Sequence, residues 1–443
     1  MDTLSESPRL PTTDWHSPTR EDTGARILTH ALVAAGIRFI FGIPGTHNIE
    51  FYDALEEEGL LTPILITDEQ SAGFMADGVF RSSGKMAALS LVPGAGLTHA
   101  LSGIAEAFLD QIPMLVIMCA PRQDLPFGYQ LHDIDQAELA NPVMKKVLKA
   151  RNHQDLWNLT RYATALALQA PAGPVAVEIP AELLFKTGKY DAQIKYPELP
   201  RTPLEFSAMD YQAIVNSLSR AERIGLYLGR GASMPARLLE SLAEHLDAVV
   251  FTSISGKGLF PENHPRFVWN GMGRALPPPL QPVENALDCI LAIGCRFSEV
   301  ATASYGFNFK AQLLHVDIDS SVFHRNYPAA HVLQADAESF VRRFLQEPSS
   351  RKPTSVTSEN LTSIAHGHEK IREELSQSKI PDALNPTLLF QQLQKSFGDN
   401  TIFVTDSGNG LFKAMESLRL PRPNSFLAPV DFSCMGYCVP AAI

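Results

Sequence analysis

Several features that mark other protein classes are scarce or missing in this chain of 443 residues. Its five cysteines form no Cys-x-x-Cys pair, which argues against a zinc ribbon or a disulfide framework. No apolar run is long enough to span a bilayer, and the first residues lack a signal-peptide core. No cluster of lysine and arginine offsets the net charge of −11, which argues against a nucleic-acid binder. We therefore expect a cytoplasmic protein with reduced cysteines, bound neither to membranes nor to nucleic acid.

The composition that remains is typical of a globular protein, with 45% hydrophobic and 19% charged residues. Apolar strand-like blocks alternate with helix-like blocks, which predicts an α/β fold of tandem, doubly wound parallel sheets. In chain order we predict a disordered tail (1–22), an N-terminal domain (23–187), a central nucleotide-fold domain (205–345), a linker (346–384) and the start of a third domain (385–443).

The last residues, "CMGYCVPAAI", are apolar and rich in small side chains. They resemble the beginning of a buried helix more than a solvated tail. A third sheet with so few strands would leave unpaired edges. The expectation is that the chain is either a fragment or completed by another polypeptide.

One acidic residue raises a question about function. The apolar segment 60–66 is followed at once by Asp68, Glu69 and Gln70, and a helix-like stretch begins there. One interpretation is helix capping, because carboxylates accept free N–H groups and suit the positive end of the helix dipole. The other is a binding or catalytic role, because ligands of open α/β sheets bind at the carboxyl ends of strands.

Ordered segments of the chain resemble the thiamin-diphosphate enzymes of the acetohydroxyacid (acetolactate) synthase, benzoylformate decarboxylase and pyruvate oxidase group. The matching phrases, in order, are "FGIPGTHNIEFYDAL", "TDEQSAGFMADGVFRSSGK", "LVPGAGLTHALSGIAEAFLDQIPMLVI", "GPVAVEIPAELL", "SGKGLFPENHP", "AIGCRFSEVATASYGF", "LLHVDID", "VTDSGNGLFKAM" and "CMGYCVPAAI". The resemblance implies a pyrimidine-binding domain, a central Rossmann-like domain and an incomplete diphosphate-binding domain.

The resemblance gives Glu69 a catalytic role: a shielded carboxylate that shares a proton with N1′ of the cofactor's pyrimidine and so activates its amino group. It also implies a set of cofactor-binding positions. These are Pro44, Gly45, Glu69, Pro93, Gly94, Asn409, Met435 and Gly436. For Pro44 and Gly45 a plain strand-to-helix turn is an open alternative, and for Met435 an ordinary core side chain is another.

The sequence also departs from the family pattern. Asp68 replaces the usual His, and Leu131-His132-Asp133 replaces a Phe-Gln-Glu triplet. His132 is a second catalytic candidate because its ordinary pKa lies near neutrality, a surface-loop histidine being the alternative. The Gly-Asp-Gly…Asn motif for Mg²⁺ is absent, so the ligands of that ion are expected beyond the chain end and no metal ligand is assigned. FAD is possible in the central domain, where Gly229-Arg230-Gly231 could cradle a diphosphate.

The predicted activity is thiamin-diphosphate-dependent decarboxylation or carboligation of a small 2-keto acid such as pyruvate, by a homodimer or homotetramer. This chain alone is expected to be inactive. The alternative is a non-catalytic or trans-completed fragment of such an enzyme that binds the cofactor weakly or not at all. A dinucleotide-dependent dehydrogenase is disfavoured, because "GIPGTH" after the first strand is not G-x-G-x-x-G.

Overall fold

The chain forms two compact units, each with its own sheet. In the computed structural model one unit comprises residues 1–201 and 432–443, and the other comprises residues 202–431. The structure describes residues 19–194, 205–347, 355–377 and 384–443. Residues 432–443, which the sequence assigned to the third domain, therefore lie in the first unit; the predicted tail falls mostly outside the described residues.

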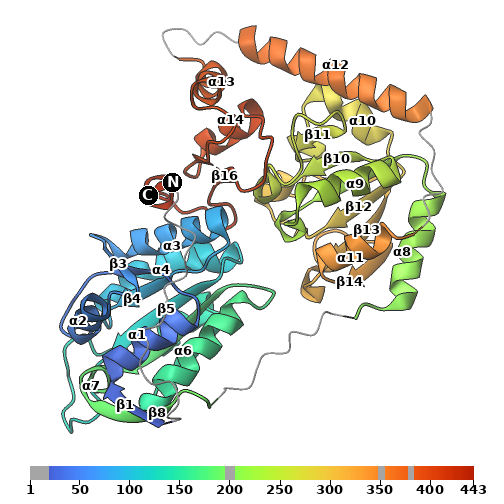
Figure 1. Cartoon of the computed structure of the whole chain (residues 1–443). Coiled ribbons are helices and arrows are strands. Elements are labelled where there is room, and N and C mark those ends of the chain that lie inside the picture. The colour runs from blue at the N-terminus through green and yellow to red at the C-terminus, as the bar shows by residue number, and fades with distance from the viewer. Residues whose placement is uncertain (1–18, 195–204, 348–354, 378–383) are drawn as a thin grey trace. The chain divides into compact units, whose positions relative to one another are not determined.

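The first unit is built on a six-stranded parallel sheet with the strand order β3-β2-β4-β5-β7-β6 (Figure 1). A separate antiparallel pair joins β1 to β8. The strands are β1 (Thr19–Thr23), β2 (Phe39–Gly42), β3 (Thr62–Leu65), β4 (Ala88–Leu91), β5 (Met114–Ala120), β6 (Lys146–Lys149), β7 (Pro174–Pro180) and β8 (Thr187–Asp191). The helices are α1 (Gly24–Ala34), α2 (Ile49–Glu58), α3 (Glu69–Ser83), α4 (Ala95–Leu109), α5 (Gln136–Ala140), α6 (His153–Leu168), α7 (Ala181–Phe185) and α15 (Cys438–Ala442).

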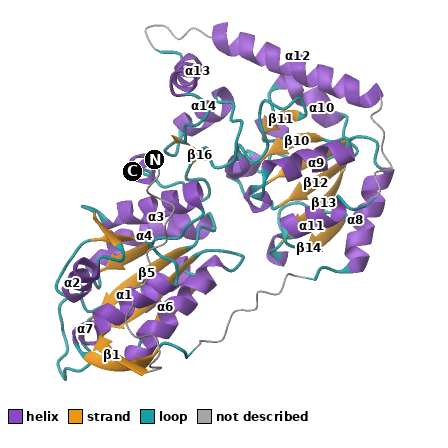
Figure 2. Ribbon diagram, in the orientation of Figure 1, coloured by secondary structure: helices purple, strands orange, loops and turns teal. Residues whose placement is uncertain are grey.

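Strand β5 shows why this sheet is covered on both faces. All of its residues are buried, and successive side chains enter different cores. Leu115 and Ile117 belong to the core that includes residues of α1 and α6. Val116 belongs to the core that includes residues of α3 and α4. An uninterrupted apolar strand is thus stable only between two helical layers, which Figure 2 shows as helices flanking the central strands.

The second unit repeats this architecture with the parallel strand order β11-β10-β9-β12-β13-β14. Its strands are β9 (Ile224–Leu228), β10 (Val249–Thr252), β11 (Phe267–Asn270), β12 (Cys289–Ile293), β13 (Gln312–Asp317), β14 (His331–Gln334) and the short parallel pair β15 (Phe403–Val404) and β16 (Phe426–Leu427). Its helices are α8 (Ala208–Arg220), α9 (Ala236–Leu246), α10 (Gln281–Asn285), α11 (Ala337–Phe344), α12 (Ser355–Gln377), α13 (Pro386–Phe397) and α14 (Asn409–Ser417). The predicted fold class, tandem doubly wound parallel α/β domains, is confirmed.

Two absences apply to the described parts of the chain. Over these ranges no helix combines the length and apolar character needed to cross a bilayer. All five cysteines fall in the described ranges, and none of them forms a disulfide bond there.

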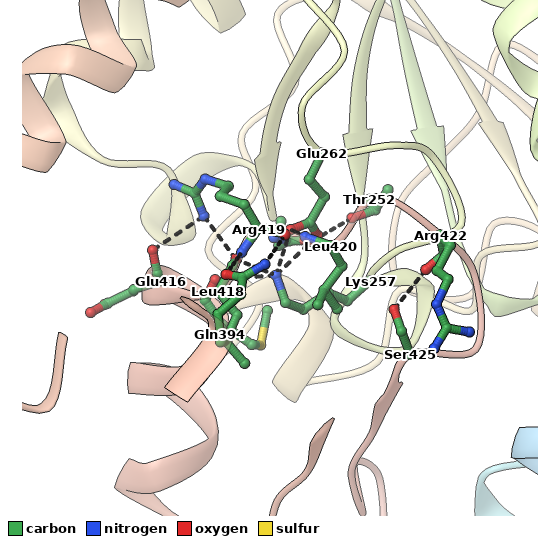
Figure 3. A network of polar contacts seen from close by, with 12 residues as sticks. Thr252, Lys257, Glu262, Gln394, Glu416, Leu418, Arg419, Leu420, Arg422 and Ser425 are labelled. Carbon is green, nitrogen blue, oxygen red and sulfur yellow. Dashed lines mark hydrogen bonds and ion pairs between the residues drawn. The ribbon is translucent and has the colours of Figure 1, made fainter. Parts of the chain in front are cut away.

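A buried ion pair fastens the second unit's sheet to the segment that follows α14 (Figure 3). Lys257 is 1% exposed and donates to both carboxylate oxygens of Glu262, at 3.0 and 2.8 Å. The ammonium also donates to the carbonyl of Leu418, and Glu262 accepts the N–H of Leu420. Burial lowers the pKa of Lys257 to about 8. The two buried charges are therefore tolerated only because they pair with each other and form hydrogen bonds with the neighbouring backbone.

We expect Lys257→Met to destabilise the second unit by roughly 3–5 kcal/mol, because Glu262 would be left buried without its cation. Urea unfolding followed by tryptophan fluorescence measures this, since Trp269 lies in this unit, beneath Arg419 at 4.6 Å. The matched control is Lys413→Met, whose pair with Glu416 is exposed. Such surface pairs contribute only ~0–1 kcal/mol. Equal losses in both variants would contradict the expectation.

Candidate active site

Glu69 stands at the carboxyl edge of the first sheet, where β3 passes into α3. The N-cap of α3 is Asp68, whose carboxylate accepts the N–H of Ser71 at 3.0 Å and its hydroxyl at 2.8 Å. Capping is therefore performed by Asp68, as expected for an acidic residue in extended conformation at that position. Glu69, one residue later, is left free of this task.

The Glu69 side chain is enclosed by protein yet almost without partners. The residue is 9% exposed, and its one ion-pair partner in the described chain is the exposed His99, with Nδ1 3.5 Å from a carboxylate oxygen. A buried carboxylate normally accepts several hydrogen bonds. A Cβ added to Gly96 would lie 3.5 Å from Oε1 of Glu69, so the start of α4 lies beside the carboxylate. The arrangement suits a ligand that offers a hydrogen-bond donor.

The turns after β2 and β4 are joined beside this carboxylate. Gly45 donates its N–H to Asn48 Oδ1 at 2.7 Å, and buried Asn48 donates to Ser90 Oγ at 3.2 Å. A Cβ on Gly45 would lie 2.7 Å from the Val92 side chain, so a larger residue there would push the turns apart. Pro44, next to Gly45, is exposed. These contacts hold the Pro44–Gly45 turn near the turn containing Pro93 and Gly94.

A segment from the other end of the chain docks on the face of α3 and α4. The Met435 carbonyl accepts a hydrogen bond from Gln70, the residue after Glu69, at 3.3 Å. Tyr437 is fully buried, packs edge-on against Phe74 with ring centroids 5.4 Å apart, and donates to Asp77 at 2.5 Å. The structure thus brings Met435 close to Glu69. The Met435 side chain is 82% exposed, which argues against the alternative of an ordinary core residue.

Beneath this segment lies a buried polar network on α3 and α4. Arg81 pairs with Asp77 at 2.6 Å and with Asp110 at 2.7 Å. Glu106, on α4, accepts the N–H of Cys434 at 2.9 Å through one oxygen, and its other oxygen has no hydrogen-bond partner. Burial, followed by the charge of Asp110, raises the pKa of Glu106 to about 8. The protonated form is therefore favoured at neutral pH.

Two predicted residues, His132 and Asn409, come from other elements of the chain. His132 is on the loop between β5 and α5, where its carbonyl packs over Gly94. Asn409 begins α14 in the second unit, so its role in the Glu69 site stays a prediction. The described ranges contain no cluster of three or more His, Cys, Asp or Glu side chains that could hold a metal ion.

Several residues of the site were missed from the sequence. Gln70, Glu106 and Tyr437 were given no role there. The ion pair between Asp77 and Arg81 could have been predicted from the sequence, because oppositely charged residues four positions apart on a helix are neighbours. The partner of Glu106 is 328 residues away, so no local pattern reveals it.

Together these features define the class of protein. Two tandem parallel α/β domains, with a shielded and underpartnered carboxylate at a strand end, are typical of an enzyme that binds a cofactor at that edge. Two family models match the chain: "Thiamine pyrophosphate enzyme, N-terminal TPP binding domain" over residues 22–139, and "Thiamine pyrophosphate enzyme, central domain" over residues 211–344. Together they cover more than half of the chain. The protein belongs to the thiamine pyrophosphate enzymes and is acetolactate synthase-like.

Curated relatives agree with this assignment. The chain is 28% identical to the acetolactate synthase large subunit of Buchnera aphidicola subsp. Schizaphis graminum, over 95% of this chain and 74% of that protein. It is 28% identical to the probable 2-ketoarginine decarboxylase AruI of Pseudomonas aeruginosa, over 96% of this chain and 75% of that protein. It is 27% identical to the acetolactate synthase isozyme 1 large subunit of Escherichia coli, over 95% of this chain and 74% of that protein.

The raised pKa of Glu106 predicts how the stability of the first unit varies with pH. The folded state holds this proton up to about pH 8, whereas the ordinary value is 4.5. Stability from the protonated carboxyl is therefore complete below pH 4.5 and is lost as pH rises to about 8. Glu106→Gln keeps a neutral side chain at every pH. We expect it to unfold at a progressively higher temperature than the wild type as pH rises through this window.

Thermal unfolding between pH 5 and pH 8 tests this expectation, with the fluorescence of Trp157 reporting on the first unit. Protonation of Glu106 affects stability over roughly this pH range. The control is Glu57→Gln, whose carboxylate is exposed in a pair with Arg26 and should give a curve parallel to the wild type. If the Glu106→Gln and wild-type curves also run parallel, Glu106 is already ionised in the folded protein.

Proposed function

We propose that this protein catalyses thiamin-diphosphate-dependent decarboxylation or carboligation of a small 2-keto acid such as pyruvate. The observation that carries the proposal is the enclosed Glu69 carboxylate, which neither caps its helix nor has a hydrogen-bond partner in the described chain. The names of two relatives, an acetolactate synthase and a 2-ketoarginine decarboxylase, support a 2-keto acid as the substrate class.

The residues around Glu69 fit an aminopyrimidine. The carboxylate can take or give a proton at the ring nitrogen N1′, and its enclosure strengthens that hydrogen bond by excluding water. Gly94 is proposed to contact the ring through its backbone. A Cβ there would lie 2.8 Å from the His132 carbonyl oxygen, so this turn has no room for a side chain. The other proposed cofactor contacts in the first unit are Pro44 and Gly45, in the turn after β2, and Pro93, in the turn after β4.

Met435 and Gly436 are proposed to contact the cofactor from the docked segment. Gly436 has φ 84°, a conformation that a side chain would strain, and the Met435 side chain reaches out from the anchored backbone. Asn409 is proposed as a diphosphate contact. When bound, thiamin diphosphate supplies a nucleophilic carbon and an electron sink for decarboxylation. The role of the protein is to orient the substrate, exclude water and control the proton on Glu69.

The accompanying Mg²⁺ is proposed as well, and no ligand for it is assigned among the described residues. A homodimer or homotetramer is proposed, as is usual for enzymes whose sites need surfaces from more than one subunit.

Flavin fits the central domain poorly at the turn that the sequence suggested. A Cβ on Gly229 would lie 2.0 Å from the Gly294 carbonyl oxygen, and one on Gly231 would lie 2.7 Å from the Gly294 Cα. The close packing of two backbone turns is enough to explain these glycines without a diphosphate. The second unit does contain a cavity of about 790 Å³, lined in part by Trp269, Arg274 and Phe412, where a planar ligand could be accommodated.

The second candidate function is a non-catalytic or trans-completed subunit that binds the cofactor weakly. Titration with thiamin diphosphate and Mg²⁺, with pyruvate turnover followed in parallel, separates the two. Cofactor binding together with turnover supports the enzyme, and binding without turnover supports the subunit.

For an active enzyme we expect Glu69→Gln to lower kcat by at least about two orders of magnitude, because an amide cannot share a proton with N1′. Folding should be preserved, since the amide has nearly the same size and Asp68 still caps α3. Steady-state turnover of pyruvate, with circular dichroism as the folding check, measures this. The matched control is Glu57→Gln, an exposed carboxylate that should leave turnover unchanged. Near-normal turnover in Glu69→Gln would refute the assignment.

A further inference from the structure

The docked segment, residues 432–443, rests on α3 through small residues. A Cβ on Gly78 of α3 would lie 2.3 Å from the Ala441 carbonyl oxygen, so the two backbones are in close contact. Three apolar side chains of the segment are exposed, namely Met435, Val439 and Ile443. The segment therefore gains little from apolar burial, which is proportional to the apolar area removed from water. Its polar contacts decide how firmly it is held.

One buried carboxyl lies directly under the docked segment. Glu106 is fully buried, and one of its oxygens accepts the N–H of Cys434 at 2.9 Å. Its other oxygen has no hydrogen-bond partner among the described residues. The Cys434 thiol donates to the Ser102 carbonyl at 3.4 Å, so Cys434 is fixed to α4 at two points. Because it contacts Glu106 directly, the segment takes part in shielding this carboxyl from water.

The charged side chains that face Glu106 come from α3 and from the C-terminal end of α4. Asp110, which follows α4, and Asp77 of α3 are both negative, and Arg81 of α3 is paired with both of them. Asp77 also accepts the hydroxyl of Tyr437, which is the second polar anchor of the docked segment. Three carboxyl groups therefore share one cation. A negative charge on Glu106 would have no cation of its own.

Protonation of Glu106 is consequently coupled to docking. Burial, followed by the charge of Asp110, raises its pKa to about 8 in the docked form, although the N–H of Cys434 and the charge of Arg81 act in the opposite direction. With the segment lifted, the carboxyl meets water and its pKa returns toward the ordinary 4.5. The docked form binds the proton more tightly, so docking is strongest below pH 4.5 and weakens as pH rises to about 8.

We propose that residues 432–443 are a pH-controlled docking segment, which stays on α3 and α4 while Glu106 is protonated and is released when this carboxyl ionises. Ionisation places a third negative charge beside Asp77 and Asp110. The unpartnered oxygen of Glu106 can then be hydrated only when the segment lifts. Release also breaks the hydrogen bond from Gln70 to the Met435 carbonyl, and so moves Met435 away from the residue next to Glu69, whatever reaction takes place there.

Hydrogen–deuterium exchange of the whole chain, read by mass spectrometry and corrected for the intrinsic pH dependence of amide exchange, measures the docking. We expect the protection of residues 432–443 to fall by at least about ten-fold between about pH 6 and pH 9, because the docked form loses its bound proton over this range. The reporting amide is that of Cys434, which donates to Glu106. Strand β12 of the second unit should keep its protection, which shows that the release is local.

Three variants make the result specific. Glu106→Gln keeps a neutral group of nearly the same size, so protection of the docked segment should stay constant with pH. Asp110→Asn removes a charge that raises the pKa of Glu106, and should move the loss of protection to lower pH. A purely structural role of Glu106 would not produce that shift. Glu57→Gln, an exposed carboxylate paired with Arg26, is the matched control and should follow the wild-type profile.

Constant protection of residues 432–443 in the wild type would overturn the proposal, as would an equal fall in the wild type and Glu106→Gln. A parallel loss of protection in β12 would also overturn it, because the whole protein would then be unfolding. Should Glu106→Gln fail to fold, Asp110→Asn decides the matter, since an unchanged pH profile in that variant contradicts control by Glu106.

Discussion

Helix α3 is the element on which the first unit's site depends. Within its first turn Asp68 takes the capping task, which leaves the neighbouring Glu69 carboxylate free and enclosed. One turn later Gly73 allows the close crossing with α4, because a Cβ there would lie 2.7 Å from Gly103 Cα. Further along, Asp77 receives both Arg81 and the docked Tyr437. A single helix therefore positions the carboxylate, the β4 turn and the segment bearing Met435.

In each unit, buried polar groups hold together segments that are far apart in the sequence. In the first unit the network around Arg81 fixes residues 434–437 on the face of α3 and α4. In the second unit Lys257 and Glu262 fix the backbone that follows α14. Both networks join segments that are far apart in the sequence. Buried charges of this kind add little net stability, but removing one partner is costly, so they specify one arrangement of the chain.

Much of the fold was predictable because its signals are local. The alternation of apolar strands with amphipathic helices predicts parallel sheets covered on both faces, and the two six-stranded sheets confirm it. Glu69 was also singled out from the sequence, because it comes shortly after an apolar strand, and its catalytic role stays a prediction. The sequence left capping and function as alternatives for this residue, and only the Asp68–Ser71 hydrogen bond assigns the cap. The possible diphosphate cradle at Gly229–Gly231 stays a prediction, and the structure adds that both glycines are packed closely against the Gly294 turn.

The sequence by itself determined the fold class and the family, because both depend on periodicity and on motifs read over short stretches. It also placed a carboxylate at the end of a strand. Only the tertiary structure decided which groups surround that carboxylate. The contacts of Glu106 with Cys434, of Gln70 with Met435 and of His47 with His132 join residues with no local relation. Whether a buried nitrogen or oxygen has a hydrogen-bond partner depends on which atoms the folded chain brings near it, and no local sequence pattern shows this.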